Sequence, residues 1–465
     1  MELRGSDLAL VTGQLGRPPL TDFSVVARCG SGHPLVIRNH PVDRAGKPFP
    51  TLYWLTCPDA VKAVSRLEAE GWIKRLGERR RSDPAFGSAL EAAHREYAAE
   101  RGRWLPEAER WGGVGGARTG VKCLHAHYAN HLSGGADPVG EWVAERVEPI
   151  HPDEDRSGRV AAVDMGTNSI RLLVASPKGD GDLFEVARDM VITRLGQGVD
   201  RTGRLAPAAL RRTMDVLARY VRRAHALGVE RIRVGATSAV RDSADRRLLD
   251  AEVSRIAGVT PEVLTGEREA ELSFLGATQG LDLPAPFLVF DIGGGSTELA
   301  LGSDAVGVAT SVDVGSVRIT ERVGPADPPT AEDLEAMRRV ADEALGEAAE
   351  RVLLGSGVTL VGVAGTTTTV QAITLGLERY DPEAIHGTVL TRDSVAEVLE
   401  RLAAMTTAER RALPVMAPGR EDVIVAGTVI LGAILDHWAA GSCVVSERDI
   451  LEGLAIEMVE GSAPR

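Results

Sequence analysis

Cysteine is scarce in this chain of 465 residues, and the few cysteines are scattered at Cys29, Cys57, Cys123 and Cys443. Their number excludes a disulfide scaffold and suits a reducing compartment such as the cytoplasm. No basic segment followed by an apolar run opens the sequence, so we expect no signal peptide. The longest near-continuous apolar run, 423–435, is too short to cross a bilayer and predicts a buried core helix. We therefore expect a soluble cytoplasmic protein that does not bind membranes.

An excess of basic charge is also missing. The chain has 53 Lys and Arg against 66 Asp and Glu, a formal net charge of −13. This balance argues against nucleic acid as a partner. Apolar residues make up 44% and charged residues 26%, which are values of a globular protein. The length suggests two or three domains.

The composition changes near residue 150. Five of the six tryptophans and three of the four cysteines come before it. The stretch EPIHPDEDRSG is polar, charged and contains proline, as linkers do. We expect a small α/β accessory domain at 1–150, a linker at 151–158, a first lobe at 159–283 and a second lobe at 284–465, whose C-terminal helix could pack back on the first lobe.

One pattern occurs twice in the larger part. The segments VAAVDMGTNSIRLLVA (160–175) and FLVFDIGGGSTELALG (287–302) both give an apolar strand, Asp, a glycine turn, Ser and a second apolar strand. Two strands around a short turn predict a hairpin. The repeat therefore predicts two similar α/β lobes. A third Gly/Thr turn follows a strand in VTLVGVAGTTTTV (358–370), and 206–227 has the spacing of an amphipathic helix.

Such turns suit phosphate. Glycine lets the backbone approach an anion and point its N–H groups at it, and a Ser or Thr hydroxyl adds a donor. An Asp at the strand end can hold Mg²⁺, whose other positions take water and phosphate oxygens. One turn is a weak signal, but two copies at the starts of two lobes would clamp one phosphate chain between them.

Four segments together resemble the exopolyphosphatase/guanosine pentaphosphate phosphohydrolase (Ppx/GppA phosphatase) family: DMGTNSIRLLV, ATSAVRDS, TGEREAELSFLG and DIGGGSTEL. The resemblance covers about 160–460. It implies an actin-like (RNase H-like) two-lobe α/β fold. It also implies Mg²⁺-dependent removal of the terminal phosphate from inorganic polyphosphate or from pppGpp, and a possible homodimer.

The resemblance also implies roles for individual residues. Glu269 matches the family's water-activating carboxylate, while Asp291 and Glu298, with Asp164 as a further candidate, would hold the metal. Without the resemblance, Glu298 could be an exposed strand carboxylate. The implied phosphate-binding residues are Gly166, Thr167, Asn168, Ser169, Arg171, Arg241, Gly293, Gly294, Gly295, Ser296, Gly365 and Thr366.

Three basic features leave alternatives open. Arg241 could instead form a surface ion pair with Asp242 or Asp245. Arg318 is a further candidate contact for phosphate. Residues 211–247 hold ten Arg against four acids, which could form either a basic strip beside the cleft or a solvated helix face.

Two departures from the family bear on the substrate. The stretch SERDILEGL lacks an Arg that the family often has there, and Arg448, three residues earlier, could or could not substitute for it. The chain also lacks the added helical domains of longer relatives, which favours short polyphosphate or a nucleotide. A different class of function remains as an alternative: a non-catalytic sensor of polyphosphate or (p)ppGpp.

The first 150 residues resemble a family without assigned function, through TLYWLTCPDAVKAVSRLEAEGWI and VKCLHAHYANHL. In CLHAH, Cys123, His125 and His127 would share one face of a strand but would not converge on a helix. With Cys29, His33 or Cys57 they could form a zinc site. No pair has the spacing of a strong zinc motif, and polar residues buried beside a tryptophan-rich core are the alternative.

Overall fold

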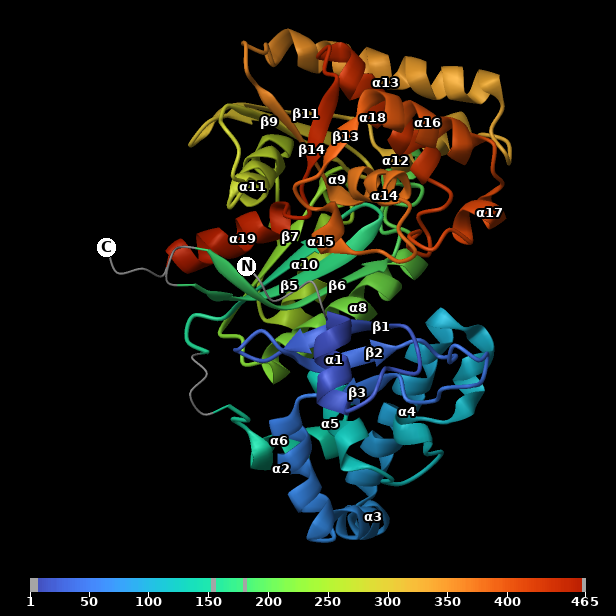
Figure 1. Ribbon diagram of the computed structural model, residues 1–465, viewed down its shortest axis with the longest axis vertical. Helices are drawn as coiled ribbons and strands as arrows, with labels where there is room; N and C mark the ends of the chain where they lie inside the picture. Colours follow the sequence, from blue (N-terminus) through green and yellow to red (C-terminus); the bar gives the residue numbers. More distant parts are fainter. Residues whose placement is uncertain (1–6, 152–155, 179–181, 462–465) are drawn as a thin grey trace.

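The computed structural model describes residues 7–151, 156–178 and 182–461. Their strands form three sheets, of three, five and six strands. Figure 1 shows the sheets following one another along the long axis, with the N-terminal part at one end and the six-stranded sheet towards the other. In the described segments no helix is long and apolar enough to cross a membrane.

The N-terminal part is a small antiparallel sheet covered by helices. Its strands are β1 (Phe23–Arg28), β2 (Pro34–Asn39) and β3 (Tyr53–Leu55). Its helices are α1 (Asp7–Leu15), α2 (Pro58–Ala69), α3 (Trp72–Ser82), α4 (Pro84–Trp104), α5 (Leu124–Leu132) and α6 (Pro138–Val147), with short 3₁₀ turns at Pro106–Trp111 and Val114–Gly116.

The five-stranded sheet has the order β6-β5-β4-β7-β8. An antiparallel ladder of β6, β5 and β4 joins the parallel strands β7 and β8. The strands are β4 (Val160–Met165), β5 (Ser169–Pro177), β6 (Leu183–Ile192), β7 (Arg231–Ala236) and β8 (Glu262–Val263). The helices are α7 (Val199–Thr202), α8 (Pro207–Ala226), α9 (Ser238–Arg241) and α10 (Arg246–Ala257).

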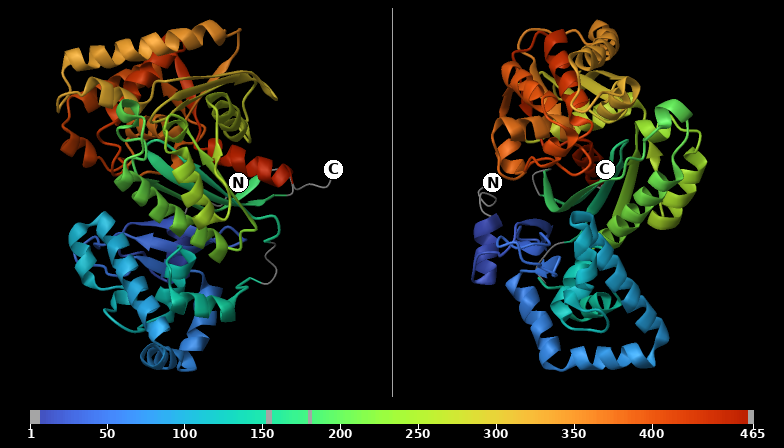
Figure 2. Two further views of the ribbon diagram at one scale, coloured as in Figure 1. Left: turned by 180° about the vertical axis from the view of Figure 1, so that it is seen from behind. Right: turned by 90° about the vertical axis from the view of Figure 1, so that its right-hand side faces the viewer.

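The six-stranded sheet repeats this order as β11-β10-β9-β12-β14 and adds β13 at its edge. Its strands are β9 (Phe287–Ile292), β10 (Thr297–Gly302), β11 (Val306–Val312), β12 (Thr359–Val363), β13 (Val389–Thr391) and β14 (Ser442–Val445). The remaining helices are α11 (Gly266–Thr278), α12 (Ser316–Val323), α13 (Ala331–Arg351), α14 (Ala364–Thr374), α15 (Pro382–Ile385), α16 (Arg392–Ala403), α17 (Thr407–Arg411), α18 (Ile424–His437) and α19 (Ile450–Glu460). Figure 2 shows α13 lying across the end of the molecule farthest from the N-terminal part.

Two helices lie between the large sheets. One side of α11, with Ala270 and Phe274, packs on the six-stranded sheet. Leu272 on its other side joins a cluster with Leu454 of α19 and with residues of β4 and β5. Because α19 returns to the five-stranded sheet after the chain has built the six-stranded one, the last helix ties the two lobes together.

Several local predictions agree with the structure, and one does not. The helix predicted at 206–227 is α8, and Gly228 follows it with φ 75°. The apolar run at 423–435 forms the buried helix α18. The prediction of a third Gly/Thr turn is wrong. After β12 only Ala364 takes a positive φ, and Gly365 and Thr366 already belong to the first turn of helix α14.

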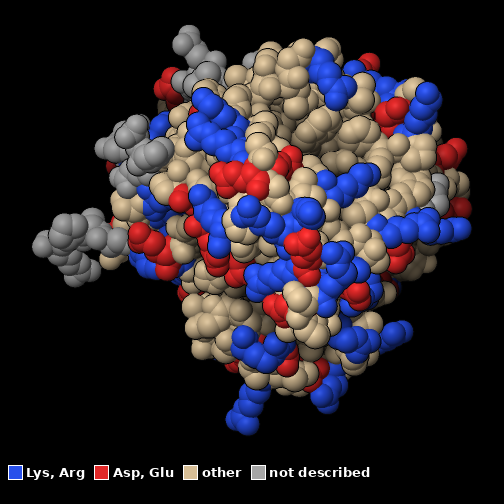
Figure 3. Space-filling model, turned by 90° about the horizontal axis from the view of Figure 1, so that it is seen from below, with Lys and Arg blue, Asp and Glu red and all other residues tan. Residues whose placement is uncertain are grey.

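The N-terminal part and the first lobe share one hydrophobic core. Two arginines of α8 cross this joint. Arg219 donates to the Ser133 carbonyl at 3.2 Å and pairs with Glu100, and Arg222 donates to the Gly134 carbonyl at 2.8 Å. A third, Arg223, pairs at 3.1 Å with Asp189 of β6 within the first lobe. Neither the basic strip nor the solvated helix face describes these three residues, because Arg219 and Arg223 are buried and Arg222 is half-buried. Figure 3, seen from the N-terminal end, shows basic and acidic side chains interspersed on that face.

Candidate active site

Two hairpins of the same construction form the frame of the site. In β4–β5, Asp164 lies opposite Arg171, and in β9–β10, Asp291 lies opposite Glu298. Each hairpin turn is closed by the same backbone hydrogen bond. Gly166 N–H donates to the Ser169 carbonyl at 2.9 Å, and the corresponding bond of the second turn measures 3.0 Å. The sequence repeat is thus a structural repeat, residue for residue, up to the position after the turn.

The two turns touch each other. A Cβ added to Gly294 would lie 3.0 Å from Cβ of Thr167, and one added to Gly295 would lie 2.2 Å from Oγ of Ser238. Glycine is required here because the backbone of the second turn packs directly on the first lobe. The contact brings the turn ends of the two hairpins, and the acidic residues beside the turns, to one place.

Four carboxylates are buried around this place. Their exposed fractions are 4% for Asp164, 7% for Glu269, 9% for Asp291 and 3% for Glu298. Desolvation disfavours a buried charge, and like charges add to the effect. Burial and the charge of Glu298 raise the pKa of Asp291 to about 8. The same two causes raise the pKa of Glu269 well above its ordinary value.

The carboxylates have too few positive partners. Arg171 donates to Asp164 at 2.7 and 2.9 Å, and Arg241 donates to Glu269 at 2.5 Å. Asp291 and Glu298 receive only serine hydroxyls among the hydrogen bonds of the described residues. Ser273 Oγ lies 3.1 Å from Asp291, Ser311 Oγ lies 2.8 Å from Glu298, and Ser296 also donates to Glu298.

The oxygen set fits a magnesium ion. Oδ1 of Asp164 is buried without a hydrogen-bond partner in the described structure, although its charge is paired through Oδ2. Mg²⁺ prefers oxygen ligands and is held by one or two carboxylates together with water and phosphate. Asp164, Asp291 and Glu298 could therefore hold such an ion, which would offset the burial and the repulsion that raise their pKa values.

Arg241 and Arg318 both pair with carboxylates, but Arg241 does not form the surface ion pair that was the alternative for it. Arg241 does not pair with Asp242 or Asp245; it donates to the Leu264 carbonyl at 2.9 Å and to Glu269. Arg318 instead pairs with Asp242 and Asp200, both at 2.5 Å. Since those acids belong to the first lobe, Arg318 holds the two lobes together and has little charge left for a substrate.

Arg171 and the C-terminal helix are also linked. The guanidinium of Arg171 pairs with Asp449, which caps α19, as well as with Asp164. Arg448 donates to Asp182 at 3.1 Å and to the Gln279 carbonyl at 3.0 Å. These contacts hold the Arg448 guanidinium at the C-terminal end of α11, where the protein itself supplies its partners.

Arg420 is a basic residue of the site that the sequence analysis missed. Its guanidinium lies over the first turn of α14, where a Cβ on Gly365 would meet it at 2.2 Å. It donates to Oγ1 of Thr369 at 2.7 Å, and no ion pair joins it to a carboxylate among the described residues. Desolvation lowers its pKa. Only the fold reveals it, because the segment PGREDV has neither a turn motif nor a periodic pattern.

The histidines of the N-terminal part do not gather as the zinc prediction required. Cys123 precedes α5 in extended conformation, so Cys123 and His125 converge, while His127 points elsewhere and contacts Asp137 at 2.8 Å. Among the described residues, Cys57 belongs to a separate group with Asp59 and His151, and Cys29 and His33 join neither group.

Comparison with known proteins now identifies the chain. The model of the Ppx/GppA phosphatase family matches residues 173–461, which is more than half of the chain. The chain therefore belongs to the Ppx/GppA phosphatase family, and it is an enzyme of the class that hydrolyses phosphoric anhydrides. Residues 25–145 match a family described as a protein of unknown function, DUF501.

Among the curated proteins, Exopolyphosphatase 2 of Mycobacterium tuberculosis is 42% identical over 313 residues, covering 64% of this chain and 98% of that protein. Exopolyphosphatase 1 of the same organism is 26% identical and covers 66% of this chain and 89% of its own length. These matches support an exopolyphosphatase-type enzyme.

Solved structures agree with the fold prediction. An exopolyphosphatase-like protein, 39% identical, superposes with a TM-score of 0.62 over 64% of this chain and 97% of its own. The Ppx/GppA family member of Aquifex aeolicus, 30% identical, gives 0.57 over 66% of this chain and 99% of its own. The actin-like two-lobe α/β fold, preceded by a small α/β part, is confirmed.

Proposed function

We propose that this chain is a Mg²⁺-dependent exopolyphosphatase, which removes the terminal phosphate of inorganic polyphosphate. The observation that carries the proposal is the convergence of four buried carboxylates with too few cations, beside two glycine turns from two lobes. A site built only to bind a polyanion would not place buried negative charge beside it. A site that holds a metal ion and activates water needs such charge.

The protein residues divide the work as follows. Glu269 accepts a hydrogen bond from water and orients it towards the terminal phosphorus, and Arg241, 2.5 Å from Glu269, holds that carboxylate in position. The water oxygen forms a bond to phosphorus, the bridging P–O bond breaks, and the proton passes to Glu269. Phosphoryl transfer depends mainly on such positioning and on neutralised charge. Asp164, Asp291 and Glu298 would hold the Mg²⁺, which when bound would supply that neutralisation.

The phosphate oxygens are held by backbone N–H groups and arginine. The turns at Gly166–Ser169 and Gly293–Ser296 provide amides from both lobes. Gly365 and Thr366 lie in the first turn of α14, where the helix dipole favours an anion. Arg420 adds a cation without an ion-pair partner in the described part of the chain. A chain of phosphates held by the two turns would gain a further positive partner in Arg420. The domain limits and a homodimer stay predictions.

The test is phosphate release with Mg²⁺ from short polyphosphate, long polyphosphate and pppGpp in parallel. We expect release from polyphosphate, and a loss of about 10²- to 10⁴-fold in Glu269→Gln, because general-base catalysis contributes about that much. Glu267→Gln is the matched control, since Glu267 lies on the same helix turn but is exposed.

Each other outcome has a definite meaning. Preference for pppGpp would change the substrate to a nucleotide and leave the site unchanged. Binding of polyphosphate without any release would make the chain a sensor. Full activity in Glu269→Gln would remove Glu269 from the role of base.

A further inference from the structure

The N-terminal part contains a group of metal-ligand side chains that the phosphatase reaction does not use. Glu68 of α2, Cys123 and His125 each offer one donor atom, and these three atoms all lie within 4.8 Å of one another. Nδ1 of His125 is 3.2 Å from Oε1 of Glu68 and 3.9 Å from Sγ of Cys123. We propose that this group binds one Zn²⁺ ion.

The distances suit zinc with little movement. Tetrahedral ligands at ordinary zinc bond lengths lie about 3.3 Å apart for nitrogen and oxygen, and about 3.6 Å apart for sulfur and nitrogen. The observed separations of 3.2 and 3.9 Å are near these values. Three protein ligands leave the fourth position for water, and the exposed fractions of His125 and Glu68, 20% and 26%, give solvent access to it.

The local fold explains why Cys123 and His125 meet although they are two residues apart. Cys123 is the N-cap of α5, with φ −155° and ψ 120°, and His125 lies in the first helical turn. An extended residue followed by a helix places the two side chains on the same side, which a helix alone does not explain. Glu68 reaches them from α2 and accepts the Leu124 N–H at 2.7 Å.

The outer contacts are those of a metal-binding histidine. Nε2 of His125 lies 3.1 Å from the Val61 carbonyl and 3.2 Å from Oγ of Ser65. A ring that donates Nε2–H to a carbonyl presents the lone pair of Nδ1 to the other two ligands. Such a supporting hydrogen bond is the usual partner of a ligating imidazole. The thiolate and imidazole donors select zinc, whereas the oxygen set of the phosphatase site suits magnesium.

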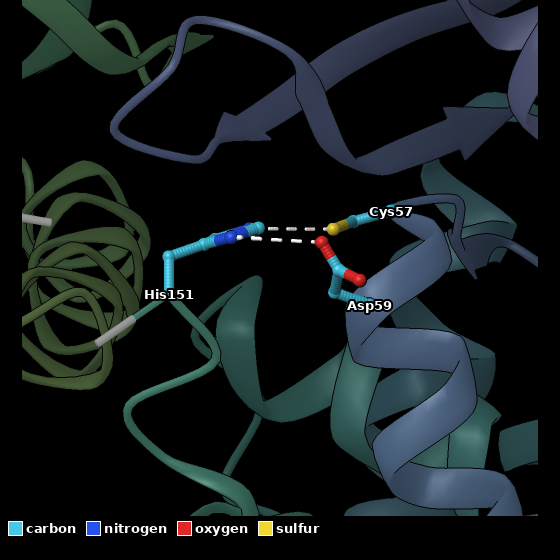
Figure 4. A group of neighbouring side chains, drawn as sticks. All are labelled: Cys57, Asp59 and His151. Carbon is cyan, nitrogen blue, oxygen red and sulfur yellow. Dashed lines mark hydrogen bonds and ion pairs between the residues drawn. The ribbon is translucent and has the colours of Figure 1, made fainter. Parts of the chain in front are cut away.

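A second group in the same part has a Cys, a His and an Asp in place of the Glu, and its donor atoms also lie within 4.8 Å of one another, but in a different arrangement. Figure 4 shows His151 pointing at Cys57 and Asp59. Sγ of Cys57 lies 3.4 Å from Nε2 of His151, while Oδ2 of Asp59 lies 3.8 Å from Nδ1. The two partners contact different nitrogens of the ring, so the imidazole lies between the thiol and the carboxylate. This group provides the matched control for the zinc site.

The experiment uses the full chain with the double substitution Asp291→Asn and Glu298→Gln, which removes the carboxylate site as a competitor for metal. Chelator-treated protein is titrated with Zn²⁺ against a chromophoric chelator, and separately with Co²⁺. We expect one equivalent of Zn²⁺ and a thiolate-to-cobalt charge-transfer band. Cys123→Ser should abolish the band and raise the zinc dissociation constant at least about 100-fold, the upper end of what loss of a supporting hydrogen bond costs.

The controls decide between the two groups. Cys57→Ser should keep both the band and the affinity, and His125→Gln should lose them as Cys123→Ser does. Circular dichroism checks that each variant folds; if Cys123→Ser does not, the readout rests on His125→Gln and Glu68→Gln. Absence of zinc binding at micromolar metal, or a band that survives Cys123→Ser and vanishes in Cys57→Ser, would overturn the proposal.

Discussion

The two hairpins of the active site have the same backbone arrangement, but the residues that face their aspartates carry opposite charges. Asp164 and Asp291 stand at the same place, each facing one residue across the ladder. In the first hairpin the facing residue is Arg171, which pairs with the acid at 2.7 Å. In the second it is Glu298, which repels the acid and helps to raise its pKa to about 8. One hairpin supplies its own cation, and the other requires one from outside.

The difference between the two facing residues explains how one of two similar hairpins can become a reaction site. Burying two facing carboxylates costs free energy unless a cation lies between them. The first hairpin avoids that cost through Arg171, which also reaches Asp449 of the capping turn of α19. We expect the first hairpin to contribute chiefly to stability and the second chiefly to catalysis. Substitutions that exchange their facing residues test this division.

The largest effect should follow from giving the second hairpin the charge pattern of the first. Glu298→Arg would place an arginine opposite Asp291, as Arg171 stands opposite Asp164. Metal ions contribute several kcal/mol to such transition states, so we expect phosphate release to fall by about 10³-fold or more. The measurement is phosphate release at saturating Mg²⁺. Glu298→Gln should lose activity to a similar degree, and a Glu298→Arg enzyme that still works would contradict the division.

The first hairpin should respond in stability. Arg171→Ala leaves Asp164, which is 4% exposed, and Asp449 without their shared cation. Removing one partner of a buried ion pair costs about 3 kcal/mol or more. Urea unfolding measures the loss. Arg204→Ala is the control in the same lobe, because the side chain of Arg204 is 70% exposed and its pair with Asp245 should contribute less than about 1 kcal/mol.

The metal-free protein should lose stability as the pH rises. Asp291, Glu298 and Glu269 have pKa values raised by burial, to about 8 for Asp291, while unfolded carboxyls titrate near about 4. The folded protein therefore holds protons that the unfolded chain has released. The contribution of these protonated carboxyls to the free energy of unfolding is fully present below about pH 4. It is lost as the pH rises through the pKa values of the carboxyls in the folded protein.

Thermal unfolding with a chelator, from pH 5 to 8.5, measures this fall. Mg²⁺ should raise the melting temperature at pH 8 much more than at pH 5, because it replaces the bound protons. The fall should be smaller in Glu298→Gln, which removes one of the repelling charges. A melting temperature that is independent of pH without metal would show that the acids of the second hairpin do not lack a cation.

The sequence predicts those parts of this site that depend on residues close together in the chain. The repeat places Asp164 and Asp291 because a strand, an Asp and a glycine turn lie within one short segment. It does not reveal Arg420, or the pairing of Arg171 with Asp449, since the latter joins residues 278 positions apart. The glycine at 365 misleads for a similar reason: the turn signal is real, but Ala364 takes the positive φ and α14 begins at once. Long-range packing decides such cases, and a local pattern contains no information on it.

The smallest effect should come from the hydroxyls that hold the acids of the second hairpin. Ser311 donates to Glu298 at 2.8 Å, a neutral donor in place of the guanidinium that serves Asp164. Ser311→Ala keeps the carboxylate but frees its orientation, and loss of such a supporting bond weakens metal binding by about tenfold. The Mg²⁺ concentration for half-maximal phosphate release should rise by that factor, with little change in the maximal rate. Ser303→Ala, on the exposed turn between β10 and β11, should leave both unchanged. If Ser311→Ala instead lowered the maximal rate at saturating Mg²⁺, the hydroxyl would act on the reaction itself. The second hairpin would then contribute more than metal binding.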